Sequence, residues 1–173
     1  MNVFILNRQR ARKINRRRLK KNAAALLAKL EIEKAELSIC LVAAPEMTRL
    51  NETFLKHKGS TDVIAFDYSD KTVGADIRRI LNIKPATQKP RGTRCVISHK
   101  NIHGEIFICV DEAILQARKF GTSWQSEVIR YLVLGVLHLV GFDDSGAGAR
   151  RKMKLEENLR LRELSRRFPL SKL

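Results

Sequence analysis

Residues 131–144 read YLVLGVLHLVGFDD, and this stretch decides the fold. Its first ten residues are apolar on every side of a helix except at His138, so the helix has no side that suits solvent and must cross the centre of the domain. A Thr-Ser pair upstream provides an N-cap, and Gly141 provides a C-terminal stop. The sequence therefore predicts a central buried helix over about residues 123–140.

Shorter segments before and after this helix predict the other elements. Apolar, β-branched runs predict strands, and apolar periodicity with N-caps such as Asn15 and Asp111 predicts helices. Strands dominate the first part of the chain and helices the last, which is typical of an α+β fold. The strands are expected at residues 3–6, 36–43, 62–68 and 105–110. The further helices are expected at residues 16–30, 45–55, 111–120 and 149–167.

Length and composition indicate one domain over residues 1–173. A chain of 173 residues, 44% of them hydrophobic, can bury a substantial core. The longest apolar stretch, residues 131–142, is well short of the roughly 20 residues that span a bilayer, so no membrane contact is expected. The three cysteines form no CxxC pair, which is typical of a reducing compartment, and we therefore expect a cytoplasmic protein.

The charge of the chain is strongly positive. Lys and Arg outnumber Asp and Glu by 34 to 18, which gives a formal net charge of +16, and the excess lies at residues 8–21, 71–103 and 150–172. Basic blocks from distant parts of one chain favour a polyanionic partner, with nucleic acid as the main candidate. An anionic membrane or an ordinary solvated surface is the alternative. The least regular part, residues 69–103, is predicted to be a basic insertion within the domain.

His138 is the strongest candidate for chemistry, because it is an imidazole in an apolar helix and two acids, Asp143 and Asp144, follow the helix stop. Imidazole and carboxylate are both metal ligands. The alternative is a core histidine that is hydrogen-bonded to a neighbouring carbonyl. A catalytic zinc takes three protein ligands, and the third could be Asp143, His57 or His103. The sequence has no GxSxG elbow, P-loop or Rossmann fingerprint, which excludes the usual machinery of acyl transfer and nucleotide hydrolysis.

Four motifs in order resemble the YbeY family of bacterial endoribonucleases, which are rRNA maturation factors. They are LNETFLKHKGSTDVIAFDY at 50–68, GEIFICVDEAILQARKFG at 104–121, LGVLHLVGFDD at 134–144 and MKLEE at 153–157. The resemblance implies a small mixed four-stranded sheet packed by helices. It also implies a zinc-dependent, single-strand-specific endoribonuclease that acts in 16S rRNA maturation and in quality control of the small ribosomal subunit. A small-subunit ribosomal protein and an Era-type GTPase are implied as partners.

The chain departs from the family signature at the metal site. The family's H-G-x-L-H-L-x-G-Y-D-H places its three histidines at Leu134, His138 and Asp144 of this sequence. Leucine has no donor atom, which excludes a three-histidine zinc site. We therefore expect His138 and Asp144 to hold a divalent ion, with magnesium or manganese as the alternative to the family's zinc.

The cationic site residues are also expected from the resemblance. The family's arginine near the site corresponds to Leu55, and Lys56 stands beside it. Lysine supplies a positive charge for a phosphate but no bidentate fork. The residues expected to be catalytic are His138, Asp144 and Lys56, and the residues expected to bind RNA are Lys56, Lys58, Arg91 and Arg94.

These observations leave two interpretations. The first is a metal-dependent endoribonuclease that cuts single-stranded rRNA beside the small ribosomal subunit. The second is a catalytically impaired rRNA-binding assembly factor that keeps the fold and the basic surface, and Leu134 is the argument for it.

Overall fold

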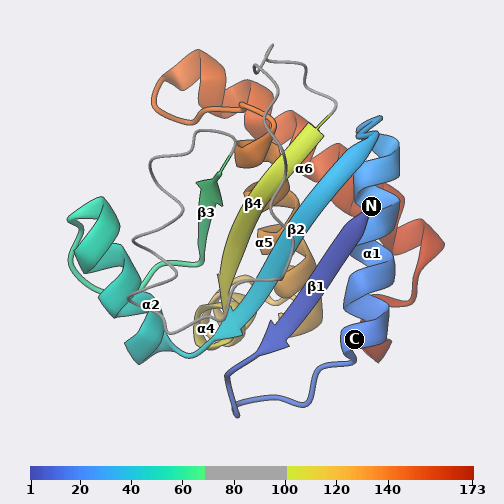
Figure 1. Cartoon of the computed structure of the whole chain (residues 1–173). Coiled ribbons are helices and arrows are strands. Elements are labelled where there is room, and N and C mark those ends of the chain that lie inside the picture. The colour runs from blue at the N-terminus through green and yellow to red at the C-terminus, as the bar shows by residue number, and fades with distance from the viewer. Residues whose placement is uncertain (69–100) are drawn as a thin grey trace.

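The computed structural model describes residues 1–68 and 101–173. Its centre is one four-stranded sheet, with α-helices packed on the sheet (Figure 1). The strands are β1 (Asn2–Asn7), β2 (Lys34–Val42), β3 (Val63–Asp67) and β4 (Asn101–Cys109). Their order is β1-β2-β4-β3, in which β1, β2 and β4 run parallel and β3 runs antiparallel to β4. The predicted α+β fold with a mixed four-stranded sheet is confirmed.

Helices cover one face of this sheet and part of the other (Figure 1). Successive residues of a strand point to opposite faces, so Ile39 and Ile106 face one core cluster while Cys40 and Phe107 face the other. Helices α1, α5 and α6 cover the first face, and α2 with η1 covers the second near β3 (Figure 1). The helical bounds are α1 (Arg16–Lys29), α2 (Ala44–Leu50), the π-helical η1 (Asn51–Leu55), α4 (Val110–Phe120), α5 (Trp124–Leu139), α6 (Ala147–Arg167) and the 3-10 turn η2 (Leu170–Lys172).

Helix α5 is the central helix that the sequence predicts. The Ser123 side chain caps it by accepting a hydrogen bond from Ser126 N at 3.1 Å. Most of the helix between Val128 and Leu137 is fully buried. Gly135 brings the helix unusually close to the sheet, since a Cβ there would stand 2.6 Å from Cγ2 of Ile106. The sheet therefore fixes both the position and the rotation of α5.

The second face of the sheet holds a buried acid. Glu105 is 2% exposed, and it accepts hydrogen bonds from Tyr68 Oη at 2.7 Å and from Cys40 Sγ at 3.4 Å. Burial, followed by the charge of Glu105, raises the pKa of the Cys40 thiol far above its ordinary value. This pair of donors satisfies the carboxylate and joins β2, β4 and the end of β3.

The structure corrects three boundary predictions. Strand β4 begins at Asn101, so residues 101–103 belong to the sheet and not to the insertion; residues 69–100, with the rest of the predicted insertion, lie outside the described residues. Helix α4 begins at Val110, with Cys109 at the N-cap, so Asp111 is not the cap. Its carboxylate instead accepts a hydrogen bond from Ala44 N at 2.7 Å and joins the starts of α2 and α4.

Within residues 1–68 and 101–173, no helix combines the length and the hydropathy needed to cross a membrane.

Candidate functional site

The chain reverses direction directly after His138. Helix α5 ends at Leu139, and Gly141 adopts a φ of 89°, a left-handed conformation that glycine accepts without strain. Gly141 N donates to the His138 carbonyl oxygen at 3.0 Å. His138 is half-buried in the last turn, so its imidazole lies where the helix meets solvent and not in the sealed core. For the alternative, a core histidine that is hydrogen-bonded to a neighbouring carbonyl, no such bond of the imidazole is found among the described residues.

The two acids beyond the turn are exposed. The Asp143 carboxylate accepts hydrogen bonds from the hydroxyl of Ser145 and from Ser145 N at 3.0 Å, and these bonds lower the pKa of Asp143. His138 is near enough for its charge to contribute to the same shift. The recorded contact of Asp144 is through its carbonyl oxygen, which accepts from Arg150 Nε at 3.2 Å. Its carboxylate is therefore not committed to a partner among the hydrogen bonds of the described residues.

The donor set of this region does not suit zinc. Within residues 1–68 and 101–173, no group of three or more His, Cys, Asp or Glu side chains is placed to hold a metal ion. A catalytic zinc takes three protein ligands. Magnesium instead keeps several waters and is bound through one or two protein oxygens together with phosphates of the substrate. His138, Asp143 and Asp144 therefore do not form a three-ligand zinc site in the described part of the chain.

Leu134 lies one helical turn before His138, on the same side of α5. It is half-buried and forms part of the wall of a cleft of about 570 Å³. Residues from α4, α5 and α6, together with Asp62 just before β3, line this cleft. The position that corresponds by resemblance to the first histidine of the family signature is thus a half-buried leucine that packs against the core and lines the cleft.

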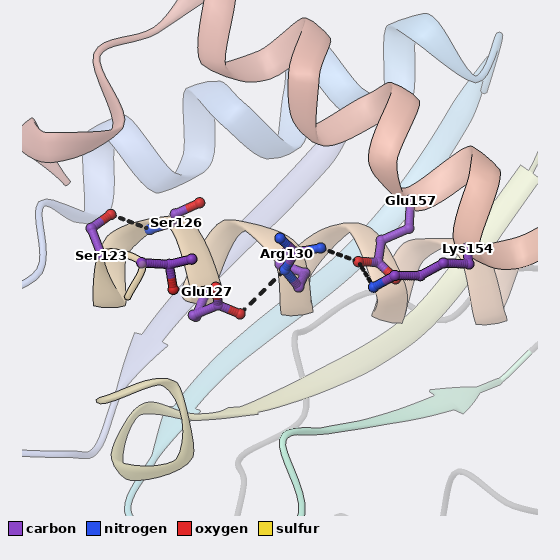
Figure 2. Close-up of polar contacts among 7 residues, drawn as sticks. Ser123, Ser126, Glu127, Arg130, Lys154 and Glu157 are labelled. Carbon is purple, nitrogen blue, oxygen red and sulfur yellow. Dashed lines mark hydrogen bonds and ion pairs between the residues drawn. The ribbon is translucent and has the colours of Figure 1, made fainter. Parts of the chain in front are cut away.

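Buried ion pairs form the polar wall of the same cleft (Figure 2). Glu127 and Glu157 are only 4% and 3% exposed. Arg130 lies between them, with its Nε 3.2 Å from Glu127 and its Nη1 in contact with Glu157. Lys154 Nζ lies 2.8 Å from the same oxygen of Glu157, and Thr122 Oγ1 donates to Glu127 at 2.7 Å. The two cations of the cleft therefore neutralise two buried acids and stabilise the contact between α5 and α6.

A buried hydroxyl completes this wall. Tyr131 is 2% exposed and lines the cleft, and its Oη has no hydrogen-bond partner among the described residues. Burial, followed by the nearby charges of Asp62 and Glu127, raises the pKa of Tyr131 well above its ordinary value. The Tyr131 hydroxyl is therefore a neutral donor near pH 7.

The predicted cations at positions 56 and 58 lie elsewhere. Lys56 ends η1 in a left-handed conformation with a φ of 60°, and its N–H bonds to the Asn51 carbonyl oxygen. Both Lys56 and Lys58 are exposed, in a loop that Asn51 Nδ2 holds through a 2.8 Å bond to Gly59 O. η1 packs on the second face of the sheet, whereas α5 packs on the first. No contact joins Lys56 to His138 or Asp144 in the described structure. Arg91 and Arg94 lie outside the described residues.

The other candidate histidines do not join His138. His57 is exposed in the same loop as Lys56. His103 lies on β4, where its ring packs edge-on against Tyr68 at 5.7 Å and its Nε2 is 3.9 Å from Glu36. Neither is part of a three-ligand group in the described part of the chain.

Sequence reasoning missed the Glu127–Arg130–Glu157 network. The signals that could have found it are the i, i+3 spacing of Glu127 and Arg130 and the placement of an acid within the apolar spacing of residues 153–164. Asp62, just before β3, also lines this cleft.

Comparison with known proteins gives one consistent result. A family model described as "Endoribonuclease YbeY" matches residues 4–165. The Endoribonuclease YbeY of Aquifex aeolicus is 28% identical over 163 residues, which cover 94% of this chain and 92% of that protein. That of Geobacter metallireducens is 30% identical over 159 residues, covering 91% of each. That of Myxococcus xanthus is 35% identical over 138 residues, which are 79% of this chain but only 40% of the longer protein.

A solved structure agrees with the fold. The solution structure of a Thermotoga maritima protein superimposes with a TM-score of 0.55 and 20% sequence identity, covering 94% of this chain and 88% of that chain. The family match spans all four strands and α5, the helix that carries the signature residues. By the extent of these matches, the chain belongs to the YbeY endoribonuclease family.

Proposed function

We propose that this protein is an endoribonuclease that acts on single-stranded rRNA in the maturation of the small ribosomal subunit. The observation that carries the proposal is the family match over residues 4–165, which includes α5, β3, β4 and nearly all of α6. The net charge of +16 supports a polyanionic substrate independently, because each neutralised phosphate releases counterions. The proposed partner is the small ribosomal subunit, which presents the RNA; the small-subunit ribosomal protein and the Era-type GTPase stay predictions from the resemblance.

The proposed roles follow from the donor set. His138 and Asp144 would hold a hydrated Mg²⁺ or Mn²⁺, which would polarise a phosphate oxygen or lower the pKa of a bound water. If His138 does not ligate the ion, its imidazole at the half-exposed end of α5 would instead accept a proton near the scissile phosphate. We further propose that Arg91 and Arg94 bind the RNA backbone.

Lys56 and Lys58 would position the RNA and not the reacting atoms. Both are exposed and lie at the second face of the sheet, whereas His138 is at the end of a helix on the first face. A strand of RNA that contacts both regions must pass around the β3 edge. Single-stranded RNA is flexible enough to follow this route. Contacts of Lys56 and Lys58 with its phosphates would fix the position of the strand without reading its sequence.

A second candidate function is an rRNA-binding assembly factor without cleavage. The specific observation that favours it is Leu134, which places an apolar side chain at the position of a family metal ligand and on the wall of the cleft. In this case the same basic surface binds the RNA, and His138 has no catalytic role.

The test is cleavage and binding of a single-stranded fragment from the 3′ end of small-subunit rRNA, with Mg²⁺, Mn²⁺ or Zn²⁺ supplied to metal-free protein. His138→Ala is compared with wild type, and His57→Ala is the matched control because His57 is exposed and away from α5. We expect cleavage with Mg²⁺ or Mn²⁺ that is lost in His138→Ala and in EDTA but retained in His57→Ala.

The outcomes separate the two functions. Salt-dependent RNA binding without cleavage under any metal overturns the endoribonuclease proposal and supports the binding factor. Cleavage that survives His138→Ala overturns the role of His138. Absence of both binding and cleavage overturns both functions.

A further inference from the structure

A second cavity lies at the opposite end of the first-face layer, where the last residues of the chain fold back beside the start of α1 (Figure 1). Its volume is about 310 Å³. Asn15 N donates to Leu173 O at 2.5 Å and holds the two segments together. One wall is basic, with Arg17, Arg18 and Lys21, and the other is apolar, with Phe168 and Leu170.

The basic wall is only partly neutralised within the described structure. The described residues that line the cavity include no Asp or Glu, and no ion pair is recorded for Arg17, Arg18 or Lys21; the carboxyl group of Leu173, whose oxygen accepts from Asn15 N, is one anionic group against three cations. The first turn of α1 has no acidic residue either. Cations at this end of a helix are opposed by the positive end of the helix dipole, so they reduce the stability of α1 while they create a strong local field for an anion.

Asn22 adds an unmatched acceptor to the same cavity. The residue is 3% exposed and lines the cavity, and its Nδ2 donates to Arg18 O at 2.9 Å. Its Oδ1 has no hydrogen-bond donor among the described residues. A buried acceptor without a partner costs folding free energy, whereas a ligand that brings an N–H or O–H group removes this cost.

We propose that this cavity binds one nucleotide of single-stranded RNA. Arg17, Arg18 and Lys21 would hold its phosphodiester, the base would lie against Phe168 and Leu170, and Asn22 Oδ1 would accept from a base amino group or a ribose hydroxyl. The volume is at the lower end of the range for small-ligand sites, which suits a single nucleotide. This inference rests on the proposed function, since it identifies a second place where the same RNA is held.

The cavity and His138 lie near opposite ends of α5. Gln125 Nε2 donates to Ser171 O at 3.3 Å, so the cavity adjoins the first turn of α5. His138 lies near the other end of the same helix, roughly 20 Å further along its axis at 1.5 Å per residue. An RNA strand that occupies both places spans several nucleotides, and the cavity therefore anchors the strand away from the point of cleavage.

The experiment measures fluorescence anisotropy of a labelled single-stranded RNA of about 12 nucleotides. The test variant is Arg17→Gln/Arg18→Gln/Lys21→Gln. The matched control is Lys34→Gln/Arg118→Gln/Lys119→Gln, which removes the same charge from exposed positions outside the three basic blocks. We expect the test variant to lose about tenfold in affinity, with a salt slope that is smaller by about 2, since each lost phosphate contact removes about 0.7. The control should change both values much less.

Asn22→Leu tests whether the cavity binds a nucleotide or only a phosphate group. It keeps the size of the side chain and removes the acceptor. We expect it to weaken the binding of adenosine monophosphate severalfold while leaving the binding of inorganic phosphate unchanged, with an unchanged circular dichroism spectrum. Equal losses for both probes would overturn the nucleotide and leave an anion site.

The same RNA-binding measurement distinguishes failure of the nucleotide cavity from failure of the proposed function. If wild type binds RNA but the test and control variants lose the same affinity, the cavity is not an RNA subsite and the proposed function stands. If wild type does not bind RNA at all, both proposals are overturned.

Discussion

Leu134 occupies the one position of the signature helix where a side chain without a donor atom replaces a ligand. It is half-buried on the wall of an open cleft, so a polar side chain there keeps contact with solvent and is not forced into the core. We predict that Leu134→His folds normally and binds Zn²⁺ at least about tenfold more tightly than wild type, because the introduced imidazole and that of His138 lie at i and i+4 on one side of the helix. Isothermal titration calorimetry measures the change.

The control for this variant is Leu155→His, which introduces a histidine at a leucine that is 65% exposed on α6. It adds the same imidazole without a neighbouring ligand from the signature. Equal zinc affinities for Leu134→His and Leu155→His would contradict the prediction and would mean that position 134 does not face His138.

Tyr131 and Tyr68 form a natural pair for measuring what a buried hydroxyl contributes. The Oη of Tyr131 has no partner among the described residues, whereas that of Tyr68 donates to Glu105 at 2.7 Å. An unsatisfied buried polar group costs about 1–3 kcal/mol. We predict that Tyr131→Phe raises the free energy of unfolding by about 1 kcal/mol and that Tyr68→Phe lowers it by about 1–3 kcal/mol. Urea denaturation checks both, and a loss of stability in Tyr131→Phe would show that the hydroxyl is satisfied in solution.

At the scale of elements, Gly135 sets how closely α5 approaches the sheet. A Cβ at this position would stand 2.6 Å from Ile106 Cγ2, and the neighbouring residues are fully buried and unable to move aside. Overpacking costs about 1–3 kcal/mol, which exceeds the gain of about 1 kcal/mol in helix propensity. We predict that Gly135→Ala lowers the melting temperature by several degrees.

Gly148→Ala is the matched substitution in α6. No atom lies within 4 Å of a Cβ built at Gly148, so only the helix propensity changes. Its melting temperature should stay the same or rise slightly. If both variants behave alike in differential scanning calorimetry, close approach of α5 to β4 does not limit the stability of the fold.

The elements differ in how far the sequence could predict them. Helix α5 was predictable because its all-apolar composition leaves no other place for it, and the Asn15 cap of α1 was predictable because its oxygen accepts from Arg18 N, as a cap requires. The start of β4 was not predictable, since Asn101 and His103 are polar and lack the apolar pattern that marks a strand in the sequence. Asp111 was mistaken for a cap because its acceptor serves Ala44, which is distant in sequence.

The candidate site was predictable only in part, because much of it depends on contacts between segments that are distant in the sequence. The turn after His138 follows from Gly141, which is a local signal. The cleft and its ion pairs depend on α5 and α6 meeting in space, and the nucleotide cavity depends on residues at the two ends of the chain. Local patterns do not report such contacts.

At the scale of the whole molecule, stability should depend on pH through buried neutral acids. Burial raises the pKa of the Cys109 thiol to about 11, and burial raises the pKa values of Cys40 and Tyr131 as well. In the unfolded chain these groups ionise near their ordinary values, so above about pH 9 the unfolded state binds fewer protons than the native state. The free energy of unfolding must therefore fall as the pH rises from about 9 towards 11.

The net charge of +16 acts separately on stability, because repulsion among exposed charges destabilises the compact state. Salt separates the two effects, because it screens repulsion between exposed charges but has little influence on a buried thiol.

We predict that urea denaturation at high salt shows a constant free energy of unfolding from pH 7 to about 8.5 and a decline above it. In Cys109→Ala the decline between pH 9 and 11 should become shallower, because one group with a raised pKa is gone. A substitution of the exposed Leu155 by Ala serves as control and should leave the slope unchanged. A slope that is the same in Cys109→Ala and wild type would mean that the Cys109 thiol titrates equally in the folded and unfolded states, and the buried position of this side chain at the junction of β4 and α4 would then be wrong.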